Sequence, residues 1–140
     1  MSILKVVVDT NVIISGLLWT GAPHDIIRLA EDKRITICSS MEIVKEISEV
    51  LARGKFLSRL EILRASREEL IASFLSVVEI VHPTESISAV KNDPDDNKIL
   101  ECAVAANANF IVSGDPHIIK LKHFRNIPIL NPRKFLKECA

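Results

Sequence analysis

The sequence of 140 residues lacks the long apolar segments that mark membrane proteins and secreted proteins. It contains no run of about 18 apolar residues, so we expect no transmembrane helix. It also has no basic leader followed by an apolar stretch and a small-residue cleavage site, so no signal peptide is expected. These absences predict a cytoplasmic protein that does not associate with a membrane.

Motifs that pair metal ligands or cysteines are missing as well. Cys38, Cys102 and Cys139 are widely spaced and form no CxxC motif, which indicates reduced thiols rather than a disulfide framework or a zinc site. The four histidines form neither an HxxxH nor an HExxH pair, so they do not predict a structural metal site. The chain has no internal repeat, low-complexity tract or linker, and residues 1–140 therefore indicate one domain.

Net charge is absent too, because 18 basic residues balance 18 acidic ones. The overall charge therefore does not indicate a nucleic-acid partner. The distribution is less even. No acid occurs between Pro116 and Lys137, where the basic residues are Lys120, Lys122, Arg125, Arg133, Lys134 and Lys137. A smaller basic set, diluted by glutamates, consists of Arg53, Lys55, Arg59, Arg64 and Arg67. Charge runs of this kind are usually solvated surfaces, and we interpret both sets in that way.

Short apolar runs alternate with helical patterns along the chain. Five runs are typical of strands, and they lie at residues 4–8, 34–38, 77–81, 110–113 and 127–130. The last run is expected at a sheet edge, because Pro128 removes one ladder donor. The helix after the second run matches a capping box of Ser39 and Glu42. This alternation predicts an α/β fold with a central, mostly parallel sheet of four to five strands, covered by helices on both faces.

Carboxylates follow two of the predicted strands. Asp9 ends the first run and Asp115 lies just beyond the fourth, while Asp93, Asp95 and Asp96 open a helix between them. Each acid has a local explanation as a helix cap or a first-turn residue. Together at one edge of a parallel sheet, however, they would raise one another's pKa unless a cation lies among them. Oxygen ligands without Cys or His favour a hard ion such as Mg²⁺ or Mn²⁺, which usually serves phosphate chemistry.

Four segments resemble those of a PIN domain in their order and spacing: VVVDTNV, the acidic helix of residues 40–51, DPDDNKILECA and FIVSGD. The resemblance covers essentially the whole chain and is strongest to the bacterial and archaeal branch described as toxins of type II toxin–antitoxin systems. It implies a three-layer α/β/α fold and a metal-dependent endoribonuclease that hydrolyses phosphodiester bonds of single-stranded RNA with Mg²⁺ or Mn²⁺. Besides the RNA, it implies a small antitoxin protein and a second copy of the chain as partners.

The resemblance also assigns roles to individual positions. The catalytic acids of the family match Asp9, Glu46, Asp96 and Asp115. The metal ligands among them match Asp9, Asp96 and Asp115. The polar residues that support these acids match Asn11, Ser113 and Asp93.

The residues alone leave two of these choices open. Glu42, Glu46 and Glu49 share one helix flank, so periodicity does not select Glu46, and a solvated glutamate stripe explains all three. Asp95 takes the place of Asp96 if the helix begins one residue earlier.

Binding of RNA to an acidic centre also needs cations near the phosphates. The candidates nearest to Asp115 in the acid-free segment are Lys120, Lys122 and Arg125. Trp19 lies at the exit of the first helix, and we interpret it as a core or partner-contacting residue rather than as a base-stacking platform.

Other functions fit the acids less well. A phosphatase with an aspartate nucleophile would have a second Asp two residues after Asp9, where this chain has Asn11. A phosphoacceptor signalling domain would have a Lys just beyond a late strand, where this chain has Asn131 and Pro132. The main alternative is a catalytically weak PIN-like module that binds RNA or a protein partner. Its expected mark is the loss of an acid, and all four candidate acids are present.

Overall fold

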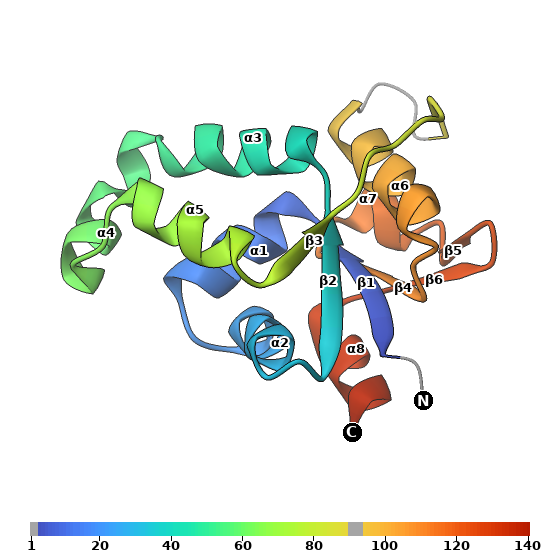
Figure 1. The fold of residues 1–140 in the computed structure, drawn as a ribbon, viewed down its shortest axis with the longest axis horizontal. Coiled ribbons are helices and arrows are strands. Elements are labelled where there is room, and N and C mark those ends of the chain that lie inside the picture. Colours follow the sequence, from blue (N-terminus) through green and yellow to red (C-terminus); the bar gives the residue numbers. More distant parts are fainter. Residues whose placement is uncertain (1–2, 90–93) are drawn as a thin grey trace.

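A sheet of six strands forms the centre of the computed structural model, which describes residues 3–89 and 94–140 (Figure 1). The strands are β1 (Leu4–Val8), β2 (Ile35–Ser39), β3 (Val78–Ile80), β4 (Phe110–Val112), β5 (His123–Phe124) and β6 (Ile127–Leu130). Their order across the sheet is β3-β2-β1-β4-β6-β5, and every neighbouring pair is parallel except β5 and β6. The predicted mostly parallel sheet is thus confirmed, with six strands instead of the four to five expected.

The additional strand changes the position of β6. We expected residues 127–130 at the sheet edge, but β6 pairs with β4 on one side and with β5 on the other. A tight turn with positive φ at Arg125 and Asn126 joins the two antiparallel strands. The pairs between β4 and β6 begin at Ile129, so Pro128 lies outside that ladder and its missing N–H costs no bond there.

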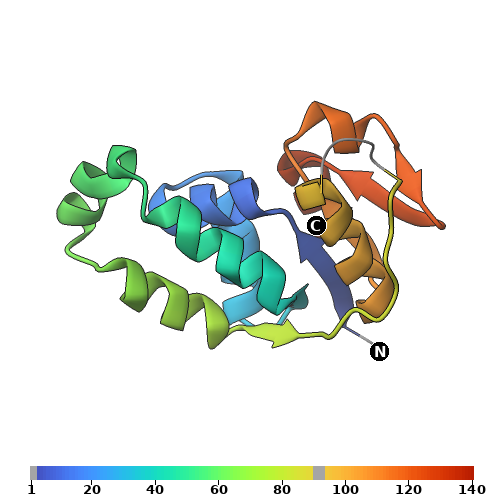
Figure 2. The ribbon, with the colours of Figure 1, turned by 90° about the horizontal axis from the view of Figure 1, so that it is seen from above.

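Helices flank the sheet on both faces. They are α1 (Thr10–Leu18), α2 (Ala22–Glu31), α3 (Met41–Leu51), the 3₁₀ turn η1 (Gly54–Phe56), α4 (Leu57–Leu63), α5 (Arg67–Leu75), α6 (Pro94–Ala106), α7 (Pro116–Ile119) and α8 (Pro132–Cys139). Seen from above, α6 and α1 lie on opposite sides of β1 (Figure 2). The helices α3, α4 and α5 extend away from the sheet at one end of the molecule (Figures 1 and 2). No helix within the described ranges is both long and apolar enough to cross a membrane.

The start of α3 differs by one residue from the expected position. Strand β2 continues through Ser39, which pairs with Ile80 of β3, so the N-cap of α3 is Ser40. Its hydroxyl accepts a hydrogen bond from Ile43 N at 3.3 Å. Because Ile43 occupies the third helical position, Glu42 cannot close a capping box, and that expectation was wrong.

One part of the core lies where α6 meets the sheet, and another is formed by buried residues of α1, α2 and α3. Helix α6 packs on β1, β2 and β4, and its small residues Cys102, Ala103 and Ala106 are all buried. Both Cys38 and Cys102 are free thiols, and burial raises the pKa of Cys102 to about 12. The prediction that the cysteines form no disulfide is confirmed, since Cys139 is free as well.

Candidate active site

Asp9 is positioned by two elements at once. It follows β1 directly, and its backbone N–H donates to Val112 O at 3.0 Å, which continues the pairing of β1 with β4. It is also the N-cap of α1, where Oδ1 accepts a hydrogen bond from Val12 N at 3.0 Å. The other carboxylate oxygen, Oδ2, accepts a hydrogen bond from the hydroxyl of Ser113. The local explanation of Asp9 as a cap and its position at the sheet edge therefore both hold.

The electrostatic setting of Asp9 favours the protonated carboxyl. Burial raises the pKa of Asp9, and the nearby charge of Asp115 adds to that rise. Hydrogen bonds from Ser113, Val12 and Gly114 lower the pKa but do not offset the effect of burial. A cation placed beside this carboxylate would favour its charged form.

Ser113 connects Asp9 with Asp115. Its hydroxyl donates to Asp9 and accepts a hydrogen bond from Asp115 N at 3.0 Å. Asp115 is the N-cap of α7, with Oδ1 accepting from His117 N at 2.8 Å. Because Ser113 is fully buried, this arrangement fixes the ends of β1 and β4 relative to each other.

Glu46 lies on the middle turn of α3 and is partly buried. Burial is the largest cause of a raised pKa for Glu46, and the neighbouring Asp95 raises the pKa further. Thr10 and the ammonium of Lys98 act in the opposite direction. Thr10 itself is buried, and its hydroxyl reaches no described residue with full hydrogen-bond geometry.

The first turn of α6 contributes two more acids in different environments. Asp95 is exposed, and Lys98 Nζ lies 3.3 Å from its Oδ1. Asp96 is buried, with 8% of its surface exposed. This difference favours Asp96 over Asp95 as the acid that faces the interior of the site. Asp93, predicted to support the acids, lies outside the described residues.

These side chains line one cleft of about 450 Å³ at the carboxyl ends of β1 and β4. All four predicted catalytic acids are among its lining residues, as is Asn11. The remaining lining residues are Thr10, Glu42, Lys45, Glu49, Val50, Arg53, Asp95, Lys98 and Ile99. The four acids lie just after β1, in α3, in α6 and at the N-cap of α7, so only the folded chain brings them together.

The cations of this cleft differ from those expected. Lys45, Arg53 and Lys98 line it, and sequence reasoning did not select them. Lys45 and Lys98 stand within the acidic helix and the DPDDNKILECA segment, which is the signal that could have identified them. Thr10 was missed as well, although it stands in the VVVDTNV segment.

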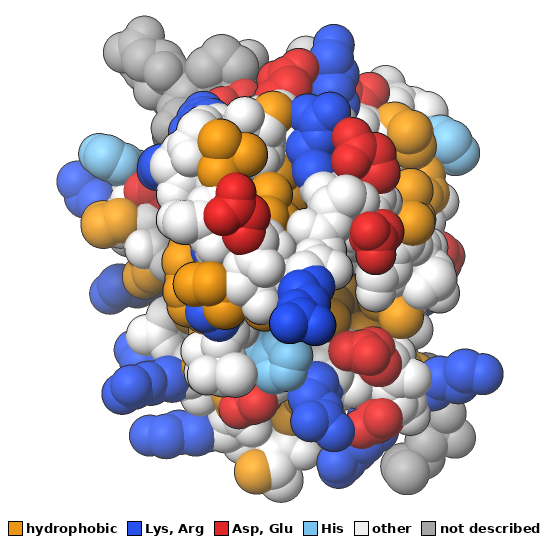
Figure 3. Space-filling view, turned by 90° about the vertical axis from the view of Figure 1, so that its left-hand side faces the viewer, with side chains coloured by type: hydrophobic (Ala, Val, Ile, Leu, Met, Phe, Trp, Pro, Cys, Tyr) orange, Lys and Arg blue, Asp and Glu red, His pale blue; other side chains and the backbone are white. Residues whose placement is uncertain are grey.

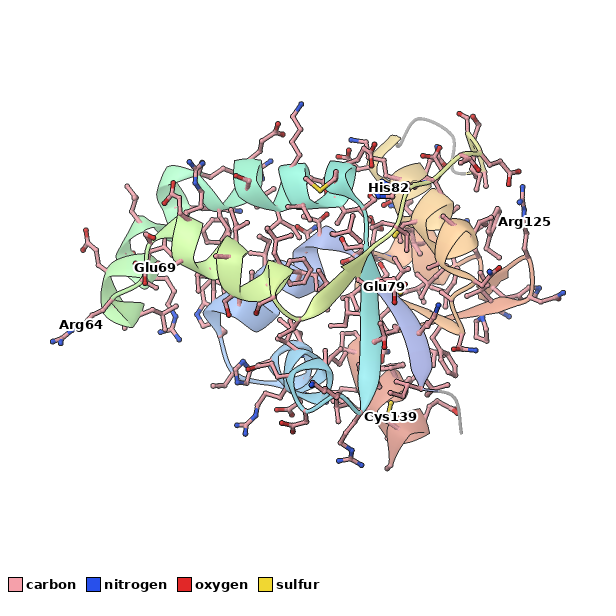
Figure 4. The ribbon with its side chains drawn as sticks, viewed as in Figure 1. Arg64, Glu69, Glu79, His82, Arg125 and Cys139 are labelled. Atoms are coloured by element: carbon pink, nitrogen blue, oxygen red, sulfur yellow. The ribbon has the colours of Figure 1, made fainter. Side chains whose placement is uncertain are left out.

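The predicted RNA-binding residues do not line the cleft. Lys120 and Lys122 are exposed beyond α7. Arg125 lies in the β5–β6 turn, at the end of the molecule opposite Arg64 (Figure 4). Its guanidinium forms two hydrogen bonds to Glu85, at 2.6 Å and 2.8 Å. Their role in RNA binding stays a prediction.

The donor set of the cleft fits a hard divalent cation. Its acidic groups are carboxylates, which suit Mg²⁺ or Mn²⁺. Burial raises the pKa values of Asp9 and Glu46, so a cation beside them would favour their charged forms. The hydroxyl of Thr10 is a further buried oxygen without a regular partner in the described structure. Within the described ranges, no three acidic, His or Cys side chains already lie close enough to hold an ion. The acids thus surround a cleft rather than form a closed ligand shell.

Comparisons with known proteins agree with this fold. A family model described as PIN domain matches residues 5–117. The uncharacterized protein MJ1680 of Methanocaldococcus jannaschii is 30% identical over 148 aligned positions, which cover 96% of this chain and 91% of that protein.

Two solved structures share the architecture. One is VapBC2 from Rickettsia felis bound to a DNA fragment from its promoter, with a TM-score of 0.65, 17% identity, and 91% of this chain and 98% of that chain covered. The other is PAE2754 from Pyrobaculum aerophilum, with a TM-score of 0.66, 14% identity, and coverage of 98% and 90%. At these identities the two structures show the shared fold alone.

Proposed function

Because this chain belongs to the PIN domain family, we propose that its acidic cleft is the active site of a metal-dependent endoribonuclease that hydrolyses single-stranded RNA. Proteins of this family are in general nucleases. The observation that carries the proposal is the convergence of Asp9, Glu46, Asp96 and Asp115 from four segments on one cleft. Carboxylates gathered at one edge of a sheet repel one another, and their assembly is readily explained if they hold an ion that acts on phosphate.

In this proposal, Asp9, Asp96 and Asp115 hold Mg²⁺ or Mn²⁺. The ion would supply positive charge to offset the charge that develops on the phosphodiester. Ser113 and the Val12 N–H orient the carboxylate of Asp9 through the hydrogen bonds described above. Cations that line the cleft would offset the repulsion between RNA phosphates and this acidic centre.

Glu46 has a separate role in the proposed reaction. Because burial raises the pKa of Glu46, its carboxylate is a stronger proton acceptor than an ordinary glutamate. We assign to it the removal of a proton from the attacking water. Thr10 and Lys98 lower the pKa of Glu46 and so favour the charged form that this role needs.

We also propose a toxin-like role for the single domain of residues 1–140, with a small antitoxin protein as a partner and a homodimer as the working unit. The sequence resemblance to toxins of type II systems supports this extension. The fold shared with VapBC2 from Rickettsia felis, a protein crystallised with DNA from its promoter, agrees with it.

The test is cleavage of a panel of defined single-stranded RNAs by the full chain, with and without Mn²⁺. Cleavage should vanish in excess EDTA and return when Mg²⁺ or Mn²⁺ is restored. The Asp9→Asn variant should be inactive with an unchanged circular dichroism spectrum. Undiminished cleavage in EDTA would overturn the proposal. Binding of RNA without cleavage in any metal would favour the catalytically weak module instead.

A further inference from the structure

Trp19, at the C-cap of α1, is an exposed aromatic residue between two helices. It is the single tryptophan of the chain, and 44% of its surface is exposed. Of the two roles that the sequence favours, a core residue or a partner-contacting residue, the exposure contradicts the first. Phe56, the last residue of η1, packs edge-on against it, with 6.2 Å between the two ring centroids. Phe56 is buried, so the position of Trp19 is fixed against the fold while part of its ring stays open.

Arg59 of α4 places a cation on the same ring. Its guanidinium lies 5.7 Å from the centre of the Trp19 ring, and its Nε donates to Leu18 O at 2.7 Å. The hydrogen bond to the end of α1 holds this guanidinium in place. Lys55 forms a second such contact, 5.1 Å from the centre of the Phe56 ring.

Basic residues prevail in the stretch that joins α3 to α4. Residues 53–60 contain three cations, Arg53, Lys55 and Arg59, and no acid. None of the three forms an ion pair with any residue of the described ranges. Figure 3 shows the end of the molecule where α4 lies, with basic side chains among hydrophobic and acidic ones.

This cluster adjoins the acidic cleft. Arg53 lines the cleft and is also the N-cap of η1, and Phe56 N donates to Arg53 O at 3.1 Å within that turn. The helices α1 and α3 run side by side toward α4 (Figure 2). From Glu46 to its last residue, Leu51, α3 rises about 7.5 Å, at 1.5 Å per residue, a distance that a short single strand can span.

We propose that Trp19 and Arg59 form a platform on which a nucleobase of single-stranded RNA stacks, next to the proposed cleavage site. The inference rests on the proposed function, which gives single-stranded RNA as the substrate of the neighbouring cleft. Aromatic rings and arginine planes are the surfaces on which unpaired bases stack, and nearby cations bind the flanking phosphates. Cations that form no ion pair within the described ranges, beside an open aromatic ring, match a polyanion that carries bases better than they match an apolar helix.

The single tryptophan makes the platform directly observable. Trp19 is the single tryptophan of the sequence, and no tyrosine is present to add to the signal. The intrinsic fluorescence therefore reports on Trp19 alone. The experiment titrates the full chain carrying Asp9→Asn, which prevents cleavage, with a single-stranded oligoribonucleotide in Mg²⁺ buffer. The comparison strand has the same length and phosphate charge but no bases. We expect the strand with bases to quench the emission and the abasic strand to leave it unchanged.

Variants of the platform give a second readout through binding of dye-labelled RNA. Trp19→Leu should weaken binding roughly 5- to 150-fold, the range that corresponds to one lost stacked base. Trp19→Phe, which retains an aromatic face, should recover most of this loss. Arg59→Gln should reduce the steepness of the salt dependence, whereas Arg34→Gln, before β2 at the opposite ends of the strands, should not. Thermal melting checks that each variant folds, because Arg59 also anchors α4 to α1.

The outcomes separate this inference from the proposed function. If the protein cleaves RNA but neither strand alters the emission, the platform is overturned and the nuclease proposal stands. Equal quenching by both strands also overturns the platform, because the response then follows phosphate charge. If quenching depends on the bases but no RNA is cleaved in any metal, the platform stands and the nuclease proposal fails.

Discussion

The hydroxyl of Ser113 donates a hydrogen bond to the carboxylate of Asp9, although 104 positions separate the two residues. The same hydroxyl accepts the backbone N–H of Asp115. One buried oxygen thus sets the position of two acids that the proposed function assigns to the metal. This relationship makes Ser113 the most informative supporting residue to change.

Ser113→Ala should lower cleavage while leaving the fold intact. The variant removes a hydrogen bond that lowers the pKa of Asp9, so that carboxyl becomes harder to ionise. Loss of such a supporting partner typically lowers metal affinity or activity by about 10- to 100-fold. Ser113→Thr keeps the hydroxyl and is the matched control. Initial rates across a range of Mn²⁺ concentrations measure the effect, and equal rates for the Ala and wild-type proteins would contradict it.

Stability without metal should fall as pH rises from about 4. The pKa values of Asp9 and Glu46 are raised in the folded protein, so the native state binds more protons than the unfolded state between the ordinary and the raised values. The free energy of unfolding therefore decreases with pH across that window and levels off above it. Urea unfolding at several pH values measures this slope. Asp9→Asn should flatten it and stabilise the metal-free protein near neutral pH.

Mn²⁺ should reverse this loss of stability. An ion that binds only the native state adds about 2.7 kcal/mol at a concentration of one hundred times its dissociation constant. The gain should be largest near neutral pH, where the acids are ionised, and smaller in acid, where protons compete for them. Thermal melting with and without millimolar Mn²⁺ tests this. A melting temperature indifferent to Mn²⁺ at neutral pH would show that the cleft binds no metal.

The three glutamates of α3 should respond differently to substitution by glutamine. Glu46→Gln should lower cleavage by orders of magnitude, because it removes the partly buried carboxylate. Glu49→Gln should cost at most a few tenths of a kcal/mol, as is typical of exposed helix positions. Glu42 lies in the first turn without a capping box, so Glu42→Gln loses only a favourable interaction with the helix dipole, about 0.3–1 kcal/mol. Equal and small effects on cleavage would mean that aspartates alone form the site.

Two sets of cations compete as RNA contacts. Lys45→Gln and Lys98→Gln should each reduce the salt dependence of RNA binding, because both residues line the cleft. Lys120→Gln and Lys122→Gln test the acid-free segment in the same assay. If the second pair leaves the salt dependence of RNA binding unchanged, the acid-free segment is an ordinary solvated surface. An unchanged slope in the first pair would place the phosphate path elsewhere.

The strand ends could be predicted because a parallel sheet leaves little freedom. Once β1 and β4 are apolar parallel strands, Asp9 and Asp115 must come to the same edge. Strand β5 could not be predicted, since two residues cannot show an alternating pattern. Ser39 and Ser40 are equally good caps in isolation, and the pairing of Ser39 with β3 decides between them.

The side chains at the rim of the cleft were harder to predict for a different reason. The apolar spacing of α3 predicts which of its residues are buried. The rotation of the helix about its axis decides which of its charged residues face the cleft. Lys45 and Arg53 therefore became visible only in the folded chain. The exposure of Trp19 depends on where α4 packs against α1, through a hydrogen bond between Arg59 and Leu18, which are 41 positions apart.

The central position of β1 has a consequence for the timing of activity. Strand β1 is made first, yet it needs β4 beside it before Ser113 can orient Asp9. At about 5–20 residues per second, roughly 5–20 s pass on the ribosome between the synthesis of these two residues. Under the proposed function, a nascent chain cannot cut RNA until most of its length has been made. A chain that ends before Ser113 lacks the residue that orients Asp9, and under the proposed function it should not cut RNA.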